Sequence, residues 1–95
     1  MEEFCIMPKN DGRWNNERKE GLVRHEVFFG KNRQKSIEDG LVVFLTPELH
    51  NMSDYGVHFN HTFDKELKQL GQKVWMEHYN KTTEEFIERY GKNYL

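Results

Sequence analysis

The chain has 95 residues, of which 36% are hydrophobic and 14% aromatic, which is enough for one domain with a modest core. Its formal net charge of −2 argues against a protein whose main task is to coat nucleic acid, and its lone cysteine, Cys5, excludes an internal disulfide and fits an intracellular setting. Because no apolar run reaches membrane-spanning length and no signal peptide is visible, we expect a cytoplasmic protein that does not enter membranes.

The first 21 residues are predicted to form an irregular arm. The segment 8–21 is polar and rich in turn-forming residues, which favours a loop over a helix or strand. Trp14 either anchors this arm or is exposed for a partner. Because tryptophan and arginine are favoured in protein interfaces, Arg13 and Trp14 are candidate partner-binding residues.

Two β-strands are predicted next. Residues 22–29 are rich in β-branched and aromatic side chains, and residues 41–45 form a second apolar run. The polar segment 30–40 between them is bounded by glycines and is predicted to be a loop, with a helical turn from Ser36 as an option. The two strands would then pair as an antiparallel hairpin with a long connection.

Helices are predicted in the second half of the chain. Thr46, Pro47 and an acid at position 48 are typical of a helix start, although residues 51–56 break the helix soon afterwards. Apolar residues at near-helical spacing predict an amphipathic helix over residues 62–79. Thr82 and Glu85 form a capping-box pattern that opens a last helix, which Gly91 closes.

Three histidines are candidate metal ligands. His25 lies in the first predicted strand, and His50 and His58 follow the second. Imidazole is the commonest side-chain ligand for zinc-like ions, and a hairpin followed by a helix can bring such residues together. We therefore expect one divalent ion, zinc before magnesium or calcium, with His61 as the competitor of His58 for the third position.

The order of these elements resembles the ββα-metal (HNH) nuclease fold, and more closely the small phage and prophage HNH-like proteins. The resemblance covers most of the chain from Arg24 onward. It is carried by these motifs, taken in order: His25-Glu26-Val27-Phe28, Gly40-Leu41, His50-Asn51, Gly56-Val57-His58-Phe59-Asn60 and Gly91-Lys92-Asn93-Tyr94-Leu95.

The resemblance implies one α+β domain over residues 1–95. Its parts would be the irregular arm 1–21, a ββ-metal core over residues 22–60 and a helical part over residues 61–95 with two C-terminal helices. Phage and prophage relatives imply a phage-encoded protein that works in the host cytoplasm.

The chain departs from the family pattern at a second, structural zinc site. Two Cys-containing pairs would hold that zinc in the family, but here the corresponding segments read Cys5-Ile6-Met7-Pro8 and Thr46-Pro47-Glu48-Leu49. Three of the four ligands are missing, and one thiolate cannot hold a structural zinc. We expect this site to be lost.

The catalytic residues of the family also lack clear counterparts. Asp39 lies where the HNH asparagine is expected, and it could replace that asparagine as a hydrogen-bond acceptor. Glu26 stands where many members carry the histidine that acts as base, and a carboxylate needs a raised pKa for that task. His25 could instead be the base, but one histidine cannot easily be both base and ligand.

A basic cluster adjoins these residues: Arg24, Lys31, Arg33 and Lys35. It is either a solvated loop or a set of contacts to phosphate or to a partner.

Two functions from different classes fit the sequence. The first is a non-catalytic, metal-binding, HNH-like phage protein that inhibits a host CRISPR effector nuclease by binding it, an analogy that rests on size, charge and origin. The alternative is a metal-dependent HNH endonuclease, in which Glu26 or His25 activates water and the basic cluster steadies the phosphate of DNA. A third, weaker option is an accessory protein of phage recombination or packaging. The sequence leaves the oligomeric state open.

Overall fold

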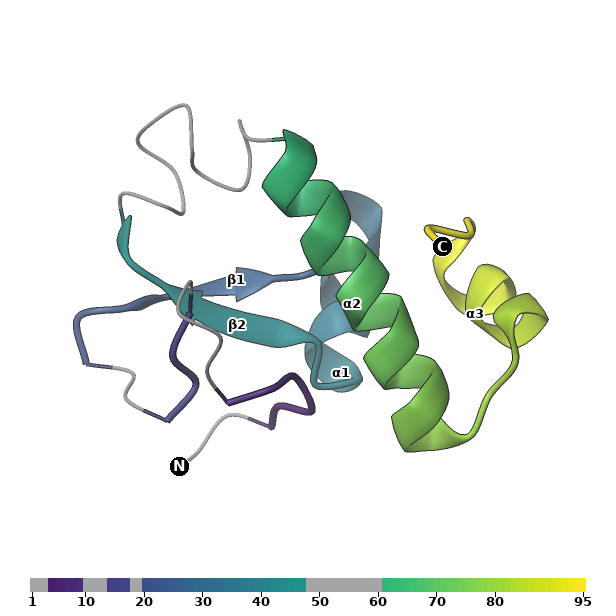
Figure 1. Ribbon diagram of the computed structural model, residues 1–95, viewed down its shortest axis with the longest axis horizontal. Coiled ribbons are helices and arrows are strands. Elements are labelled where there is room, and N and C mark those ends of the chain that lie inside the picture. Colours follow the sequence, from purple (N-terminus) through teal and green to yellow (C-terminus); the bar gives the residue numbers. More distant parts are fainter. Residues whose placement is uncertain (1–3, 10–13, 18–19, 48–60) are drawn as a thin grey trace.

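The computed structural model describes residues 4–9, 14–17, 20–47 and 61–95. Within these ranges the chain forms a small α+β domain with an antiparallel strand pair and three α-helices, so the predicted α+β class is confirmed, whereas the HNH-like form of it stays a prediction (Figure 1). The elements in chain order are β1 (Val23–Glu26), the 3-10 turn η1 (Gly30–Asn32), α1 (Arg33–Glu38), β2 (Val42–Leu45), α2 (His61–Tyr79) and α3 (Thr83–Tyr90).

The two strands pair in the register Val23↔Leu45, Arg24↔Phe44, His25↔Val43 and Glu26↔Val42. Every residue of β2 is buried, whereas His25 is the one buried residue of β1. A run of β-branched and aromatic residues suits a strand that is covered on both faces. Both predicted strands are confirmed, although β1 is shorter than the apolar pattern that indicated it.

The connection between the strands contains η1 and α1, which the sequence did not clearly predict. Ser36, the position where a helical turn was an option, is fully buried in α1. Its hydroxyl donates to the carbonyl oxygen of Leu41 at 2.6 Å and accepts from the amide of Phe28 at 3.1 Å. One small side chain thus ties the exit from β1 to the entry into β2, which a long flexible loop could not do.

The N-terminal arm lies along β2. The amide of Ile6 donates to the carbonyl of Gly40 at 2.8 Å, and the amide of Asn15 donates to the carbonyl of Phe44 at 3.1 Å. The amide of Phe44 donates to the side-chain oxygen of Asn16 at 3.0 Å. These bonds satisfy backbone groups on an edge strand that would otherwise attract another chain.

Trp14 anchors this arm inside the molecule. Its ring is 3% exposed and belongs to the hydrophobic core, and its indole nitrogen donates to the carbonyl of Pro8 at 2.9 Å. Of the two alternatives for Trp14, the structure therefore shows the one in which the ring anchors the arm, and a role of Trp14 in partner binding stays a prediction. Arg13 lies outside the described residues.

Cys5 also helps to hold the arm against β2. Its thiol donates to the carbonyl of Val42 at 3.1 Å and accepts from the side-chain amide of Asn16 at 3.5 Å. This is a role in fixing the arm to β2, and it needs no second cysteine.

Aromatic rings join the hairpin to the two long helices. The ring of Phe28, directly after β1, lies 5.5 Å from Phe86, 4.7 Å from Tyr90 and 5.2 Å from Tyr94. Trp75 of α2 meets Phe86 of α3 edge to face at 5.4 Å. In Figure 1 the strands lie on one side of α2 and α3 lies on the other. Large rings therefore supply much of the core of this short chain, as its composition indicated.

The boundaries of the last helix follow the sequence closely. The amide of Glu85 donates to the hydroxyl of Thr82 at 3.1 Å, and the amide of Thr82 donates to the carboxylate of Glu85 at 3.0 Å, so the predicted capping box is confirmed. Gly91 ends the helix in a left-handed conformation, with φ of 87°. The predicted amphipathic helix is confirmed as α2.

The C-terminal tail is held by two glutamines of α2. Gln72, fully buried, accepts from the amide of Tyr94 at 2.8 Å and donates to the side chain of Asn93 at 2.8 Å. Gln69 donates to the carbonyl of Tyr94 at 3.0 Å. The tail motif that contributed to the family resemblance therefore has a packing role.

The short helix predicted to begin at Thr46 lies mostly outside the described residues. In the part of the chain that the structure describes, none of the helices combines the length and the apolar character that crossing a bilayer requires.

Gly71 lets α2 pack tightly against Val27 and Phe28, which follow β1. A Cβ atom at this position would meet the Cγ1 of Val27 at 2.8 Å and the ring of Phe28 at 3.2 Å. Alanine normally stabilises a helix interior over glycine, but this clash with a buried, stiff side chain should outweigh that gain. We expect Gly71→Ala to lower the free energy of unfolding by about 1–2 kcal/mol in urea denaturation. Lys73→Ala, at an exposed position of the same helix, should change it little, and a stabilised Gly71→Ala variant would contradict the packing described.

Candidate functional site

The structure places His25 inside the domain. The residue is 1% exposed, and its ring lies 5.7 Å from the ring of Phe29. The amine of Lys68 lies 4.2 Å from the centre of the same Phe29 ring. Lys68 belongs to the first half of α2. Phe29 therefore contacts both His25 of β1 and the first half of α2.

The other candidate metal ligands are less fully described. His50 and His58 lie outside the described residues, and His61 begins α2 with a side chain that is not described. Among residues 4–9, 14–17, 20–47 and 61–95, no group of three His, Cys, Asp or Glu side chains is arranged to hold a metal ion. A site built from His25 together with His50 and His58 therefore stays a prediction.

Glu26 is held between two arginines. Its Oε2 accepts from the Nε of Arg24 at 3.1 Å, and its Oε1 accepts from the Nε of Arg33 at 2.8 Å. The carboxylate is 13% exposed. Both oxygens are thus engaged by guanidinium groups, whereas a general base needs an oxygen that can reach and accept a substrate proton.

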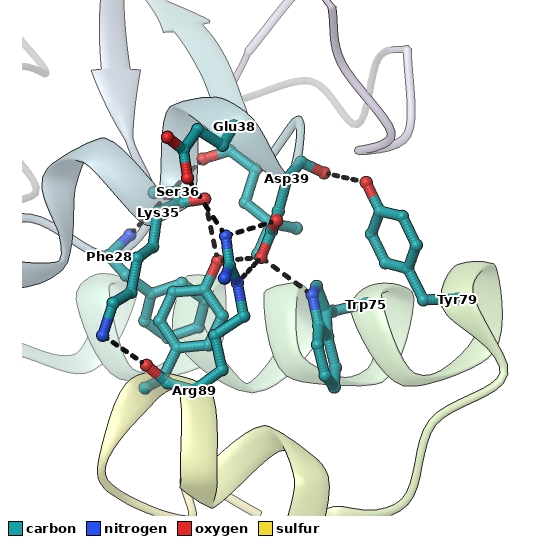
Figure 2. A network of polar contacts seen from close by, with 10 residues as sticks. Phe28, Lys35, Ser36, Glu38, Asp39, Trp75, Tyr79 and Arg89 are labelled. Carbon is teal, nitrogen blue, oxygen red and sulfur yellow. Dashed lines mark hydrogen bonds and ion pairs between the residues drawn. The ribbon is translucent and has the colours of Figure 1, made fainter.

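Asp39 is the centre of a polar network that joins the helices (Figure 2). Its Oδ2 accepts from the indole nitrogen of Trp75 at 2.9 Å, from the Nε of Arg89 at 2.6 Å and from the hydroxyl of Tyr90 at 2.6 Å. Its Oδ1 accepts from the Nη2 of Arg89 at 2.8 Å, and its carbonyl accepts from Tyr79 at 3.0 Å. Asp39 is an acceptor, as expected, but these donors come from α2 and α3.

This network changes the protonation equilibria of its members. Burial raises the pKa of Tyr90 far above its ordinary value, and the hydrogen bond to Asp39 adds to this because it favours the protonated phenol. The hydrogen bond from Arg89 to Asp39 raises the pKa of the guanidinium further. The network therefore contains a charged pair and a neutral phenol, an arrangement suited to holding elements together.

The sequence indicates that some donors of this network need an acceptor, but it does not indicate that the acceptor is Asp39. A buried tryptophan or tyrosine needs a hydrogen-bond partner, so apolar positions such as Trp75 and Tyr90 imply an acceptor somewhere in the core. Nothing in the local pattern says that the acceptor is a carboxylate more than thirty positions away.

The four residues of the basic cluster do not act together: Lys35 binds α3, whereas Arg24 and Arg33 bind Glu26. Lys35 donates to the carbonyl of Arg89 at 2.7 Å, and the side chain of Asn32 donates to the carbonyl of Tyr90 at 3.1 Å. These two bonds satisfy carbonyls in the last turn of α3, where a cation is favoured by the helix dipole. Lys35 is therefore better explained as a cap of α3 than as a phosphate contact. Lys31 is exposed, and Arg24 and Arg33 flank Glu26.

A shallow hollow of about 430 Å³ lies beside this network, lined by Lys35, Trp75, Lys81, Glu85, Glu88 and Arg89. Its cations have acidic neighbours: Lys81 pairs with Glu85 at 3.5 Å and Arg89 with Glu38 at 3.3 Å. Mixed and internally paired charges of this kind do not indicate one class of ligand.

Comparisons with known proteins add no relative: no protein-family model, no curated protein and no solved structure matches this chain. The assignment of function therefore depends on the geometry of the chain itself.

Asp39→Asn should destabilise the protein strongly. The amide keeps one acceptor oxygen but presents an N–H₂ group to donors of Arg89, which keeps only its longer and more exposed contact with Glu38. We expect a loss of about 2–4 kcal/mol in the free energy of unfolding, measured by urea denaturation. Glu38→Gln is the matched control, because its carboxylate is 54% exposed and its removal should cost less than about 1 kcal/mol. Equal, small effects would show that α3 docks without the Asp39 carboxylate.

Tyr90 should make the protein sensitive to alkali. Below a pH of about 10 the phenol is protonated in both the folded and unfolded states, so its contribution is fully present there. Above that pH the unfolded chain loses the proton first, because the pKa of Tyr90 is raised in the folded state, and stability falls. Tyr90→Phe should therefore show a shallower loss of stability between about pH 10 and about pH 12. Parallel curves for the two proteins would contradict this role.

Proposed function

We propose that this protein is a phage-derived, HNH-like metal-binding protein without catalytic activity, which acts in the host cytoplasm by binding and inhibiting a CRISPR effector nuclease. The observation that carries the non-catalytic part is the state of the two candidate catalytic carboxylates. Glu26 is held by two guanidinium groups, and Asp39 is buried under donors from α2 and α3.

The HNH-like part of the proposal is supported by the order and pairing of the elements. β1 and β2 pair antiparallel across a polar connection, a helix follows β2, and His25 lies buried on β1. Within such an arrangement His25, His50 and His58 would hold one zinc ion. When bound, zinc would supply cross-linking of the hairpin to the segment that leads into α2, which matters in a domain with so small a core.

The binding part of the proposal is supported by the ion pairs of the two candidate catalytic carboxylates. Glu26 and Asp39 are both held by arginines in a small domain with net charge −2, which favours a role in binding over one in catalysis. An inhibitor needs a rigid surface and no activated water. The choice of a CRISPR effector as the target follows from the size, charge and phage-like resemblance of the chain, and it rests on analogy.

A metal-dependent HNH endonuclease remains the second candidate function. It is favoured by one observation, the presence of Arg24 and Arg33 beside the end of β1 that carries His25. Guanidinium groups there could hold the phosphates of DNA, and a divalent ion would stabilise the leaving oxygen.

The two candidates give opposite results in a paired assay. The purified protein should contain about one zinc ion per chain by elemental analysis. It should inhibit DNA cleavage by at least one member of a panel of purified CRISPR effectors, and it should not cleave plasmid DNA itself in Mg²⁺, Mn²⁺ or Zn²⁺. Glu26→Gln should retain inhibition, because no water needs to be activated.

The metal ligands are tested separately by stability. A chelator should lower the Tm of the unmodified protein, whereas His25→Ala should have a low Tm that the chelator does not change further. His78→Ala, at an exposed position near the end of α2, should behave like the unmodified protein. Cleavage of DNA that Glu26→Gln abolishes would decide for the endonuclease, and failure to inhibit any effector would contradict the proposed target.

A further inference from the structure

We infer that Asp64 is a ligand of the zinc ion that His25 binds, and that its carboxylate closes this metal site. The inference deepens the proposed function and rests on its claim that the domain holds one zinc ion. Asp64 lies in the first turn of α2, and the sequence did not indicate it as a ligand.

One carboxylate oxygen of Asp64 is bound and the other is not. Its Oδ2 pairs with the amine of Lys68, one turn further along α2, at 2.9 Å, and the aspartate side chain is 18% exposed. Its Oδ1 is buried and accepts no hydrogen bond from the part of the chain that the structure describes. A buried acceptor without a partner is costly, because it has lost the hydrogen bonds that water would make to it. A cation at Oδ1 would remove that cost.

His25 lies on the face of the hairpin that α2 covers. The amide of Val27 donates to the carbonyl of Leu41, which continues the strand pairing one residue beyond the end of β1. Because side chains alternate along a strand, His25 and Val27 point to the same face. A Cβ atom on Gly71 would lie 2.8 Å from the Cγ1 of Val27, so this face packs against α2. The buried side chain of His25 therefore points toward the helix that carries Asp64.

The first half of α2 leads from this contact to Asp64. Lys68 lies about one turn before Gly71, and its amine is 4.2 Å from the centre of the Phe29 ring. The same ring lies 5.7 Å from the ring of His25. Asp64 is one turn nearer the start of α2 and is bound to Lys68. His25 and Asp64 thus belong to the same end of the interface between the hairpin and α2, on two elements that a shared metal ion would join.

The types of donor favour zinc at this point. Imidazole nitrogen and carboxylate oxygen are both ligands of zinc, and a structural zinc site has four protein ligands, whereas a catalytic site keeps one position open. The proposed function supplies three histidines, and Asp64 would be the fourth ligand. A ligating carboxylate is itself held by a hydrogen bond, which is the place that Lys68 has at Oδ2. A closed site agrees with a protein that does not activate water.

The test compares three variants by competition for zinc with a chromogenic chelator and by the visible absorption of the Co²⁺-loaded protein. Asp64→Asn should bind zinc about 100-fold more weakly, and its Co²⁺ absorption should lose the intensity of a four-coordinate site, because water replaces the carboxylate. Lys68→Gln, which breaks the ion pair but keeps Oδ1, should lose only about tenfold in affinity. Glu77→Gln removes the same charge as Asp64→Asn from an exposed position of α2 and should bind zinc like the unmodified protein.

Thermal stability separates a metal ligand from a residue that only stabilises the start of a helix. Asp64→Asn should have a lower Tm than the unmodified protein when zinc is bound. This difference should largely disappear once a chelator has removed the metal from both proteins. An equal difference in Tm with and without zinc would show that Asp64 acts only on the first turn of α2, and it would overturn the inference.

The zinc content separates this inference from the proposed function. If the unmodified protein and Asp64→Asn bind zinc equally well, the inference fails while the proposed metal site stands. If the unmodified protein binds no zinc, the proposed metal site fails and the inference fails with it. In that case the inhibition assay still decides whether the protein acts on a CRISPR effector.

Discussion

The carboxylate of Asp39 is the interaction on which the arrangement of this domain depends. It lies at the turn between α1 and β2, and it accepts hydrogen bonds from Trp75 of α2 and from Arg89 and Tyr90 of α3. A buried charge is costly unless it is paired and its remaining lone pairs are satisfied. Here the carboxylate accepts four hydrogen bonds, two of which come from the guanidinium of Arg89. Because apolar contacts between rings tolerate several angles and bonds to one carboxylate do not, this residue fixes how α3 sits against the hairpin and α2.

The two-stranded sheet also depends on contacts from other parts of the chain, because an isolated pair of strands is only marginally stable. The arm hydrogen-bonds along β2 through Ile6 and Asn15, and the burial of Trp14 anchors it. Gly40 permits this contact, because it has a φ of 78° and a Cβ there would come within 3.0 Å of the Ile6 amide. The arm is therefore part of the sheet's stability, although its sequence has the composition of a loop.

The sequence predicted what depends on local pattern and missed what depends on distant partners. The strands, α2 and the capping box of α3 follow from residue periodicity and from hydrogen bonds within a few positions, and all are present. The helix α1 was only an option, because its buried face rests on a single serine and a short polar segment. The sequence leaves Trp14 either as an anchor of the arm or as an exposed residue, because no periodic pattern near it indicates a buried face. The catalytic roles of Glu26 and Asp39 follow from the family resemblance alone, and the resemblance does not reveal their structural partners, the most distant of which, Tyr90, lies fifty-one positions from Asp39. His50 and His58 lie outside the described residues, so the predicted metal site stays a prediction.

Several ionic side chains that are candidates for a functional role hold elements of the domain together. Lys35 caps α3, and Arg89 binds Asp39. The two candidate catalytic carboxylates, Glu26 and Asp39, both accept hydrogen bonds from arginines. At the end of β1, Glu26 accepts from Arg24 of the same strand and from Arg33 of α1, so this triad also joins two elements. A carboxylate whose two oxygens both accept hydrogen bonds from guanidinium groups is poorly placed to take a proton from a substrate. The ion-paired triad therefore weakens the case for catalysis, because the position that the resemblance gives to a general base is used to hold β1 and α1 together.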